Sequence, residues 1–205
     1  MRSSGKSLTG KALLEKIRSD FIGLDTTYQT VGGEKTRRIY LDSTASSLML
    51  RPTAQITADF MSHYSNTHSK LHHSAHISTA AYDWAHERIL SFLSADPDIY
   101  TCFFTGSGTT GGINRMARVF RDVHPEKDTA IISIMEHHSN DLPHRKHMQH
   151  VYHVPVDGLD ENQMCISLPK LEEALHDGAG KVSYVSITAV SNVTGIINPI
   201  HDIAR

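Results

Sequence analysis

The sequence has few cysteines, no long hydrophobic run and no excess of charge of either sign. Its 205 residues include only Cys102 and Cys165, too few for a disulfide framework, which fits a reducing cytoplasm. No run of 18 apolar residues occurs, so we expect neither a spanning helix nor membrane binding. The 20 Lys and Arg residues nearly balance the 22 Asp and Glu residues. This balance argues against a broad nucleic-acid-binding surface.

Histidine is abundant instead, at 15 of 205 residues. Four histidines share one segment and four more recur every three residues: His68, His72, His73 and His76, then His144, His147, His150 and His153. Imidazoles three residues apart on a helix can bind zinc or nickel. However, no cysteine or carboxylate completes a ligand set, and residues 151–156 have the pattern of a strand. A His-rich metal-binding protein therefore stays an alternative, and no metal site is predicted.

The first hundred residues favour helices. Apolar residues at helical spacing predict a helix within residues 8–22. Pro52 is placed to begin a second helix, which runs to about Tyr64. Ser78 is a candidate N-cap for a third helix over 78–94. We expect residues 1–38 to form an N-terminal helical segment and residues 39–205 to form a larger domain.

From residue 101 onward, short β-branched runs alternate with longer amphipathic stretches. The expected strands cover 101–105, 129–134, 151–156 and 182–188, and the expected helices cover 108–121, 139–148 and 168–176. This alternation predicts an α/β fold with a mostly parallel sheet and helices on both faces. Such sheets bind ligands at the carboxyl ends of their strands, so the turns after residues 105, 134 and 188 are the places to search.

The first of these turns, residues 105–112, contains four glycines and the two adjacent hydroxyl side chains of Thr109 and Thr110. Successive backbone N–H groups at the start of a helix form an anion site, and hydroxyl groups add donors. The turn is neither a P-loop nor a clean dinucleotide fingerprint. Its position favours a phosphate cradle over the alternative, a flexible connector.

The other two turns carry a histidine pair and an asparagine. In residues 135–140, the imidazole of His137 could act as a base, a metal ligand or a flat surface for an aromatic cofactor, or the turn could only cap the next helix. In residues 191–195, Asn192 could donate its amide to a phenolate or carboxylate, or could only form an Asx turn.

Taken together, the motifs resemble those of the class V, fold-type I pyridoxal-phosphate enzymes, and most closely the cysteine desulfurase and selenocysteine lyase branch. The resemblance rests on five ordered segments: Tyr40-Leu41-Asp42-Ser43-Thr44-Ala45-Ser46, Asn66-Thr67-His68, Phe104 to Asn114, Met135 to Pro143, and Ser191 to Pro199. It covers about 165 residues, from 39 to the end.

This resemblance implies a cofactor, pyridoxal 5'-phosphate (PLP), an amino-acid substrate and a cytoplasmic enzyme. It implies that Gly108, Thr109 and Thr110 hold the cofactor phosphate. By the same resemblance, His137 stacks on the pyridine ring, and Asn192 bonds the phenolic oxygen of the cofactor or the substrate carboxylate. Ala45 and His68 would border the substrate. The expected partner is a second copy of the chain or a complementing C-terminal chain.

The chain departs from the family pattern in two places. Residues 106–108 make the turn one residue longer than usual, and Gly111-Gly112 replaces the usual Glu-Ala. In the family, the Asp that bonds the pyridine nitrogen and the Lys that forms the Schiff base follow the Asn-Pro helix, whereas this sequence ends at Arg205. Lys146 is the one lysine near a motif, and we expect it to face water.

We therefore interpret the chain as the N-terminal part of a PLP-dependent enzyme, desulfurase-like or aminotransferase-like, that is inactive alone. Cys102 is expected in a buried strand and Cys165 in a loop, so neither is a candidate for persulfide chemistry. The alternative to an enzyme is a non-catalytic module of the same fold that pairs with a partner chain.

Overall fold

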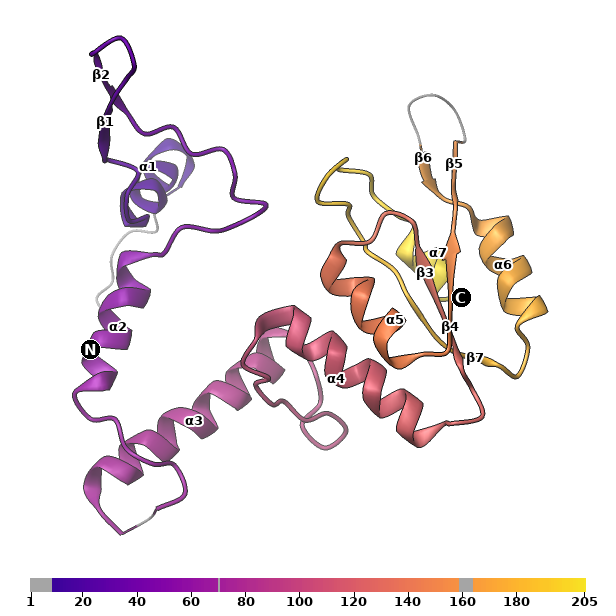
Figure 1. Ribbon diagram of the computed structural model, residues 1–205. Coiled ribbons are helices and arrows are strands. Elements are labelled where there is room, and N and C mark those ends of the chain that lie inside the picture. Colours follow the sequence, from indigo (N-terminus) through magenta and orange to yellow (C-terminus); the bar gives the residue numbers. More distant parts are fainter. Residues whose placement is uncertain (1–8, 70, 159–163) are drawn as a thin grey trace. The chain divides into compact units, whose positions relative to one another are not determined.

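The computed structural model describes residues 9–69, 71–158 and 164–205 (Figure 1). The chain forms two compact units, Met1–Phe103 and Phe104–Arg205. Within the described ranges, no helix is long and apolar enough to cross a membrane.

The first unit contains helices and one pair of short strands. Its elements are α1 (Gly10–Asp20), the antiparallel strands β1 (Thr27–Gln29) and β2 (Lys35–Arg37), α2 (Arg51–Met61) and α3 (His73–Phe92). The predicted helices near residues 8–22 and from Pro52 are both present, and Pro52 lies in the first turn of α2. A proline is tolerated there because the first N–H groups of a helix have no partner within the helix.

The predicted N-cap at Ser78 is wrong, because α3 begins five residues earlier, at His73. His72 caps the helix instead: its Nδ1 accepts a hydrogen bond from the Ala75 N–H at 3.3 Å. Ser78 is buried inside α3, where its Oγ accepts the Ser65 N–H at 2.9 Å. A neutral imidazole nitrogen can thus take the place of the oxygen acceptor that usually marks a helix start.

The second unit contains the parallel sheet. Its elements are α4 (Gly108–Val123), β3 (Thr129–Ser133), the 3-10 helix η1 (His138–Asn140), α5 (Leu142–His147), β4 (His150–Val154), β5 (Val156–Gly158), β6 (Met164–Ile166), α6 (Leu168–Asp177), β7 (Val182–Ser186) and α7 (Ile200–Ile203). The strand order is β4-β3-β7, with both pairs parallel, and Ile131 lies opposite Tyr152 and Val185. The strands β5 and β6 form a separate antiparallel pair.

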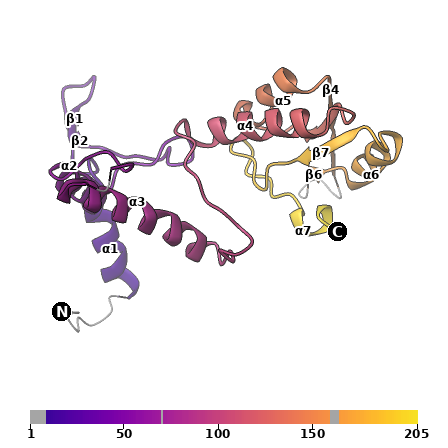
Figure 2. The same ribbon diagram turned by 90° about the horizontal axis from the view of Figure 1, so that it is seen from below.

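Helices cover both faces of this sheet (Figure 2). On one face, Ile131 and Val154 pack in a buried cluster with Leu171 of α6. On the other face, the rings of Phe120 in α4 and Tyr184 in β7 lie 5.0 Å apart. The alternation of side chains along each strand explains this division, since successive residues point to opposite faces. The predicted α/β fold with helices on both faces is therefore confirmed.

Three predicted elements differ in detail, and prolines account for two of the differences. The predicted helix over 139–148 is divided into η1 and α5, with Pro143 in the first turn of α5. The predicted strand over 151–156 is divided at Pro155 into β4 and β5. Proline lacks the N–H that either a helix or a strand ladder would use. Cys165 lies half-buried in β6 rather than in a loop.

The predicted strand over 101–105 is wrong. Cys102 is half-buried, whereas Phe103 and Phe104 are exposed, and the segment is not part of any strand. A strand forms only where a neighbour accepts its backbone hydrogen bonds. In the part of the chain that the structure describes, no strand pairs with residues 101–105.

Candidate functional site

The carboxyl ends of β3 and β7 lie side by side, because the two strands are parallel neighbours. The turn with His137 directly follows β3, and residues 187–199 follow β7. The helix α4 contacts η1 and α5, so the helix that begins in the glycine turn packs against the His137 turn. Residues from two of the three predicted turns therefore meet at one sheet edge, and α4 joins them to the third.

The glycine turn has the properties of an open anion cradle. Gly106 and Gly108 have φ angles of +85° and +58°, which L-residues with side chains rarely adopt. Apart from the adjoining residues and the backbone of the helix itself, no atom lies within 4 Å of the position that a Cβ would take at either glycine, so a ligand could approach the backbone. Thr109 and Thr110 are exposed in the first turn of α4, where N–H groups have no partner within the helix. The donors present here suit a phosphate group.

His137 caps the helix that follows it, which is one of the roles that its sequence position suggested. It is the N-cap of η1, and its Nδ1 accepts the Ser139 N–H at 3.1 Å. The Ser139 hydroxyl lies 2.8 Å from the same nitrogen. The side chain nevertheless remains exposed. The capping bond therefore fixes the base of the imidazole while leaving the ring available to a flat ligand.

The loop with Asn192 is closed by hydrogen bonds from its neighbours. The buried Ser191 accepts the N–H groups of Val193 and Thr194 at 3.4 and 3.2 Å. Asn198, which is only 3% exposed, donates its amide to the Thr188 carbonyl at 2.7 Å. The side chain of Asn192 itself is exposed. The loop is thus anchored at its base while Asn192 faces outward.

The His137 turn and the Asn192 loop are connected by four residues whose roles the sequence did not indicate: Glu136, Asn140, Thr188 and Asn198. The Glu136 carboxylate accepts hydrogen bonds from Ser133, Asn140 and the backbone of Thr188. Asn198 holds the Thr188 carbonyl from the other side. Glu136 and Asn140 lie within three residues of His137 in the sequence. Thr188 is 52 residues from Glu136, so no local signal linked it to the His137 turn.

The network continues from Asn140 into the buried layer between α5 and the sheet. His144, 2% exposed, has its Nε2 3.1 Å from Asn140 Oδ1 and its Nδ1 2.9 Å from the Tyr184 hydroxyl. Because Asn140 Oδ1 is an acceptor, Nε2 carries the proton and the tyrosine donates to Nδ1. Burial lowers the pKa of His144 and raises the pKa of Tyr184 to about 12.

The histidine clusters do not converge on a metal site in this structure. His144 is engaged as described, and His153 Nε2 lies 3.0 Å from Asp141 Oδ1. The pKa of Asp141 is lowered, chiefly by the hydrogen bond from Arg145 at 2.7 Å. Across residues 9–69, 71–158 and 164–205, no three His, Cys, Asp or Glu side chains are grouped closely enough to hold a metal ion.

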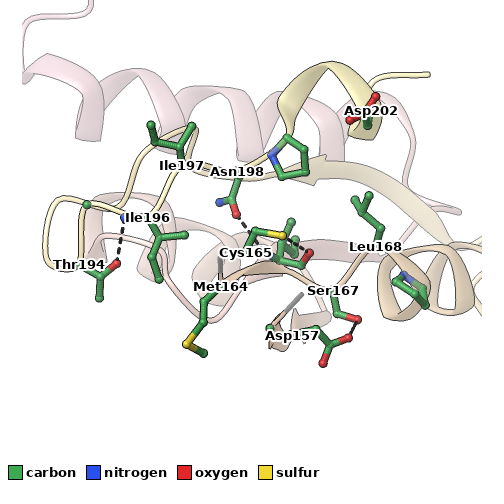
Figure 3. Close-up of a pocket in the computed structure, with 15 residues that line it drawn as sticks. Asp157, Met164, Cys165, Ser167, Leu168, Thr194, Ile196, Ile197, Asn198 and Asp202 are labelled. Atoms are coloured by element: carbon green, nitrogen blue, oxygen red, sulfur yellow. Dashed lines mark hydrogen bonds between the residues drawn. The ribbon is translucent and has the colours of Figure 1, made fainter. Parts of the chain in front are cut away.

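A cavity of about 1260 Å³ lies next to the base of the Asn192 loop (Figure 3). It is lined by the β5–β6 pair, the start of α6 and residues 194–199. Asn198 projects into this region, where its Oδ1 accepts the Ile166 N–H at 3.0 Å. None of the predicted site residues lines the cavity. Asn198 lines the cavity and also bonds the Thr188 carbonyl, so it connects the cavity wall to the segment that follows β7.

The predicted substrate residues Ala45 and His68 lie in the first unit. Ala45 is exposed in a turn, and His68 is exposed with its N–H donating to Asn66 Oδ1 at 2.8 Å. The turns with His137 and Asn192 and the glycine turn before α4 all belong to the second unit.

The lysines described in the second unit are poor candidates for a neutral amine at the site. Lys127 and Lys181 precede β3 and β7, so they lie toward the amino ends of the strands. Lys146 is exposed on the last turn of α5, shortly before β4 begins. Lys170 Nζ lies 2.5 Å from a carboxylate oxygen of Glu173, and this hydrogen bond raises the pKa of the lysine.

Comparisons with known proteins show which family this chain is similar to. A family model described as aminotransferase class-V matches residues 39–205. A probable cysteine desulfurase of Halalkalibacterium halodurans is 32% identical over 175 residues, which are 82% of this chain and 40% of that protein. A cysteine desulfurase of Haloferax volcanii is 27% identical over 207 residues, covering 93% of this chain and 46% of that protein. The chain thus spans less than half the length of these curated relatives.

Solved structures show the same fold. The apo structure of a cysteine desulfurase from Thermococcus onnurineus NA1 matches with a TM-score of 0.71 and 20% identity, over 96% of this chain and 44% of that one. The cysteine desulfurase CsdA from Escherichia coli matches with a TM-score of 0.62 and 25% identity, over 94% of this chain and 44% of that one.

Burial of His144 predicts a pH-dependent stability. Its pKa lies below the ordinary value of 6.5, so the unfolded chain takes up a proton at a higher pH than the folded chain does. The free energy of unfolding should therefore fall as the pH drops from about 6.5 toward the lowered pKa, and should be insensitive to this group above pH 7. Urea unfolding of the His144→Gln variant should show a shallower dependence in that window.

The dependence should not vanish in this variant, because burial also lowers the pKa of His147. His176→Gln, at an exposed side chain on α6, is the matched control and should retain the slope of the unsubstituted chain. Identical slopes for all three proteins would contradict the assignment.

Proposed function

Because the chain belongs to the aminotransferase class-V family, whose members depend on PLP, we propose that it binds PLP at the carboxyl edge of its parallel sheet. The observation that carries the proposal is the open glycine turn at the start of α4. Gly106 and Gly108 adopt positive φ angles, with free space where side chains would stand. A phosphate group there would meet backbone N–H groups and the positive end of a 16-residue helix.

Three parts of the chain would hold the cofactor. The backbone N–H and hydroxyl groups of Thr109 and Thr110 would bind its phosphate, next to Gly108, whose own N–H donates to the Gly106 carbonyl at 2.9 Å. The His137 ring, held by its capping bond to Ser139, would stack on the pyridine ring. The exposed Asn192 would donate its amide to the phenolic oxygen or to a substrate carboxylate. When bound, PLP supplies an electron-withdrawing ring that stabilises negative charge at the α-carbon of an amino acid.

The names of the relatives favour an amino-acid substrate and a desulfurase-like reaction over an aminotransferase-like one. Ala45 and His68 would border that substrate. The chain spans 40% and 46% of the two relatives described above, so the full reaction is proposed for an assembly rather than for these 205 residues alone. The assembly would be a homodimer or a complex with a complementing chain, in the cytoplasm. The alternative is a non-catalytic module that binds PLP and pairs with a partner chain.

The phosphate and ring contacts can be tested separately by substitution. Thr110→Val removes a hydroxyl donor to an anion, a bond worth about 1.5–3 kcal/mol, so PLP affinity should fall at least tenfold. His137→Asn keeps an acceptor for the Ser139 N–H but removes the aromatic face, so PLP affinity should also fall. Fluorescence titration with PLP would measure both.

Thr36→Val, an exposed threonine in the β1–β2 hairpin, is the matched control for Thr110→Val and should bind PLP like the unsubstituted chain. Unchanged affinity in both site variants would contradict the proposed location of the cofactor.

The positions of the described lysines predict that binding to this chain is non-covalent. Lys146 is exposed near the amino end of β4, and Lys170 is held protonated by Glu173. Borohydride treatment in the presence of PLP should therefore label no single lysine stoichiometrically, as read by peptide mass mapping. The 205-residue chain should also release no sulfide from cysteine.

One stoichiometrically labelled lysine, with Lys146 the first to inspect, would show that the chain carries its own catalytic amine. Sulfide release that appears only after a complementing chain is added would support the enzyme, and its persistent absence would favour the non-catalytic module.

A further inference from the structure

The half-buried Glu136 joins three segments that meet at the carboxyl edge of the sheet. Its Oε1 accepts the Ser133 hydroxyl at 2.6 Å and the Thr188 N–H at 2.8 Å. Its Oε2 accepts the Asn140 amide at 2.7 Å. These partners come from the end of β3, the end of η1 and the segment that follows β7. One carboxylate therefore ties the His137 turn to a segment 52 residues away.

Thr188 links Glu136 to the loop that contains Asn192. Its N–H binds Glu136, and its carbonyl accepts the Asn198 amide at 2.7 Å. Asn198 also donates its backbone N–H to the Ala189 carbonyl at 2.9 Å. The two ends of the loop, at residues 188–189 and at 198, are thus closed on each other. The base of the Asn192 loop is fixed to the His137 turn through the side chain of Glu136.

We propose that Glu136 is a positioning residue, which holds the His137 turn and the Asn192 loop at a fixed separation for a phosphorylated aromatic ligand. This inference rests on the proposed PLP function, and it assigns a role to a side chain that does not itself touch the ligand. A site whose parts are held in place before binding loses less conformational freedom when the ligand arrives.

Hydrogen-bond chemistry explains why this position needs a carboxylate. All three partners of Glu136 are donors, and an ionised carboxylate is an acceptor only. A glutamine would present one NH₂ group, which would face at least one of these donors. Asn140 cannot turn its amide to compensate, because its Oδ1 already accepts the Ser186 hydroxyl at 2.8 Å and lies 3.1 Å from His144 Nε2. We call the three hydrogen bonds that Glu136 accepts from Ser133, Asn140 and Thr188 the clamp. Glu136→Gln therefore breaks the clamp while leaving the size of the side chain nearly unchanged.

The test compares Glu136→Gln with the unsubstituted 205-residue chain, using PLP and inorganic phosphate as separate probes. Glu172→Gln, at an exposed glutamate on α6, is the matched control. We expect Glu136→Gln to weaken PLP binding at least tenfold and to change the circular dichroism of the bound chromophore. Binding of inorganic phosphate, followed by NMR, should stay within twofold, because the glycine turn is not part of the clamp. Glu172→Gln should alter neither.

Hydrogen exchange tests the clamp without any ligand. The Thr188 amide should exchange at least tenfold faster in Glu136→Gln than in the unsubstituted chain, and amides in β3 should not. If Glu136→Gln does not fold, Ser133→Ala removes one donor and keeps the carboxylate; it should show a smaller change in the same direction.

Each outcome separates the two proposals. Equal losses of PLP and phosphate binding would overturn the positioning role and indicate general destabilisation. Unchanged PLP binding and unchanged Thr188 exchange would also overturn it. If the unsubstituted chain does not bind PLP, the proposed function fails, and faster Thr188 exchange would still support the clamp.

Discussion

The arrangement of the second unit depends on one constraint, the parallel pairing of β3 with both β4 and β7. Parallel pairing brings the carboxyl ends of the strands to one edge, so that segments distant in sequence emerge side by side. The helices that cover the two faces make the apolar contacts that exclude water from the sheet, with Ile131 on one face and Tyr184 on the other. The edge at the carboxyl ends of the strands is where the polar side chains of the candidate site lie.

Hydrogen bonds rather than apolar packing hold the segments at that edge. Glu136, Asn140 and Asn198 each serve two or more partners, and each bonded atom has the donor or acceptor role that its partner requires. Buried polar networks are stable only when every member is satisfied. Because the hydrogen-bonding groups of this network have their partners, the backbone beneath the exposed side chains of His137 and Asn192 is held in a fixed conformation.

Much of this architecture could be predicted from the sequence, because local patterns determine it. The alternation of strands and helices, Pro52 at the start of α2 and the glycine turn before α4 follow from propensities of neighbouring residues. Pro155 was an available signal for the break between β4 and β5. The helix cap at His72 was not predicted, because imidazole is an unusual cap. Residues 101–105 have the composition of a strand but lack a described partner, and no local pattern reports the partner of a strand. The hydrogen bond from the Thr188 N–H to Glu136 could not be predicted either, because the two residues are 52 positions apart and no local pattern connects them.

The central claim, that the chain binds PLP at the carboxyl edge of this sheet, is tested most directly by NMR of the ¹⁵N-labelled chain titrated with PLP and, separately, with inorganic phosphate. The account predicts that phosphate shifts the amides of residues 108–110, and that PLP shifts these together with the amides around His137 and Asn192. Shifts confined to the cavity lined by Cys165 and Asn198, or no shifts at millimolar PLP, would contradict it.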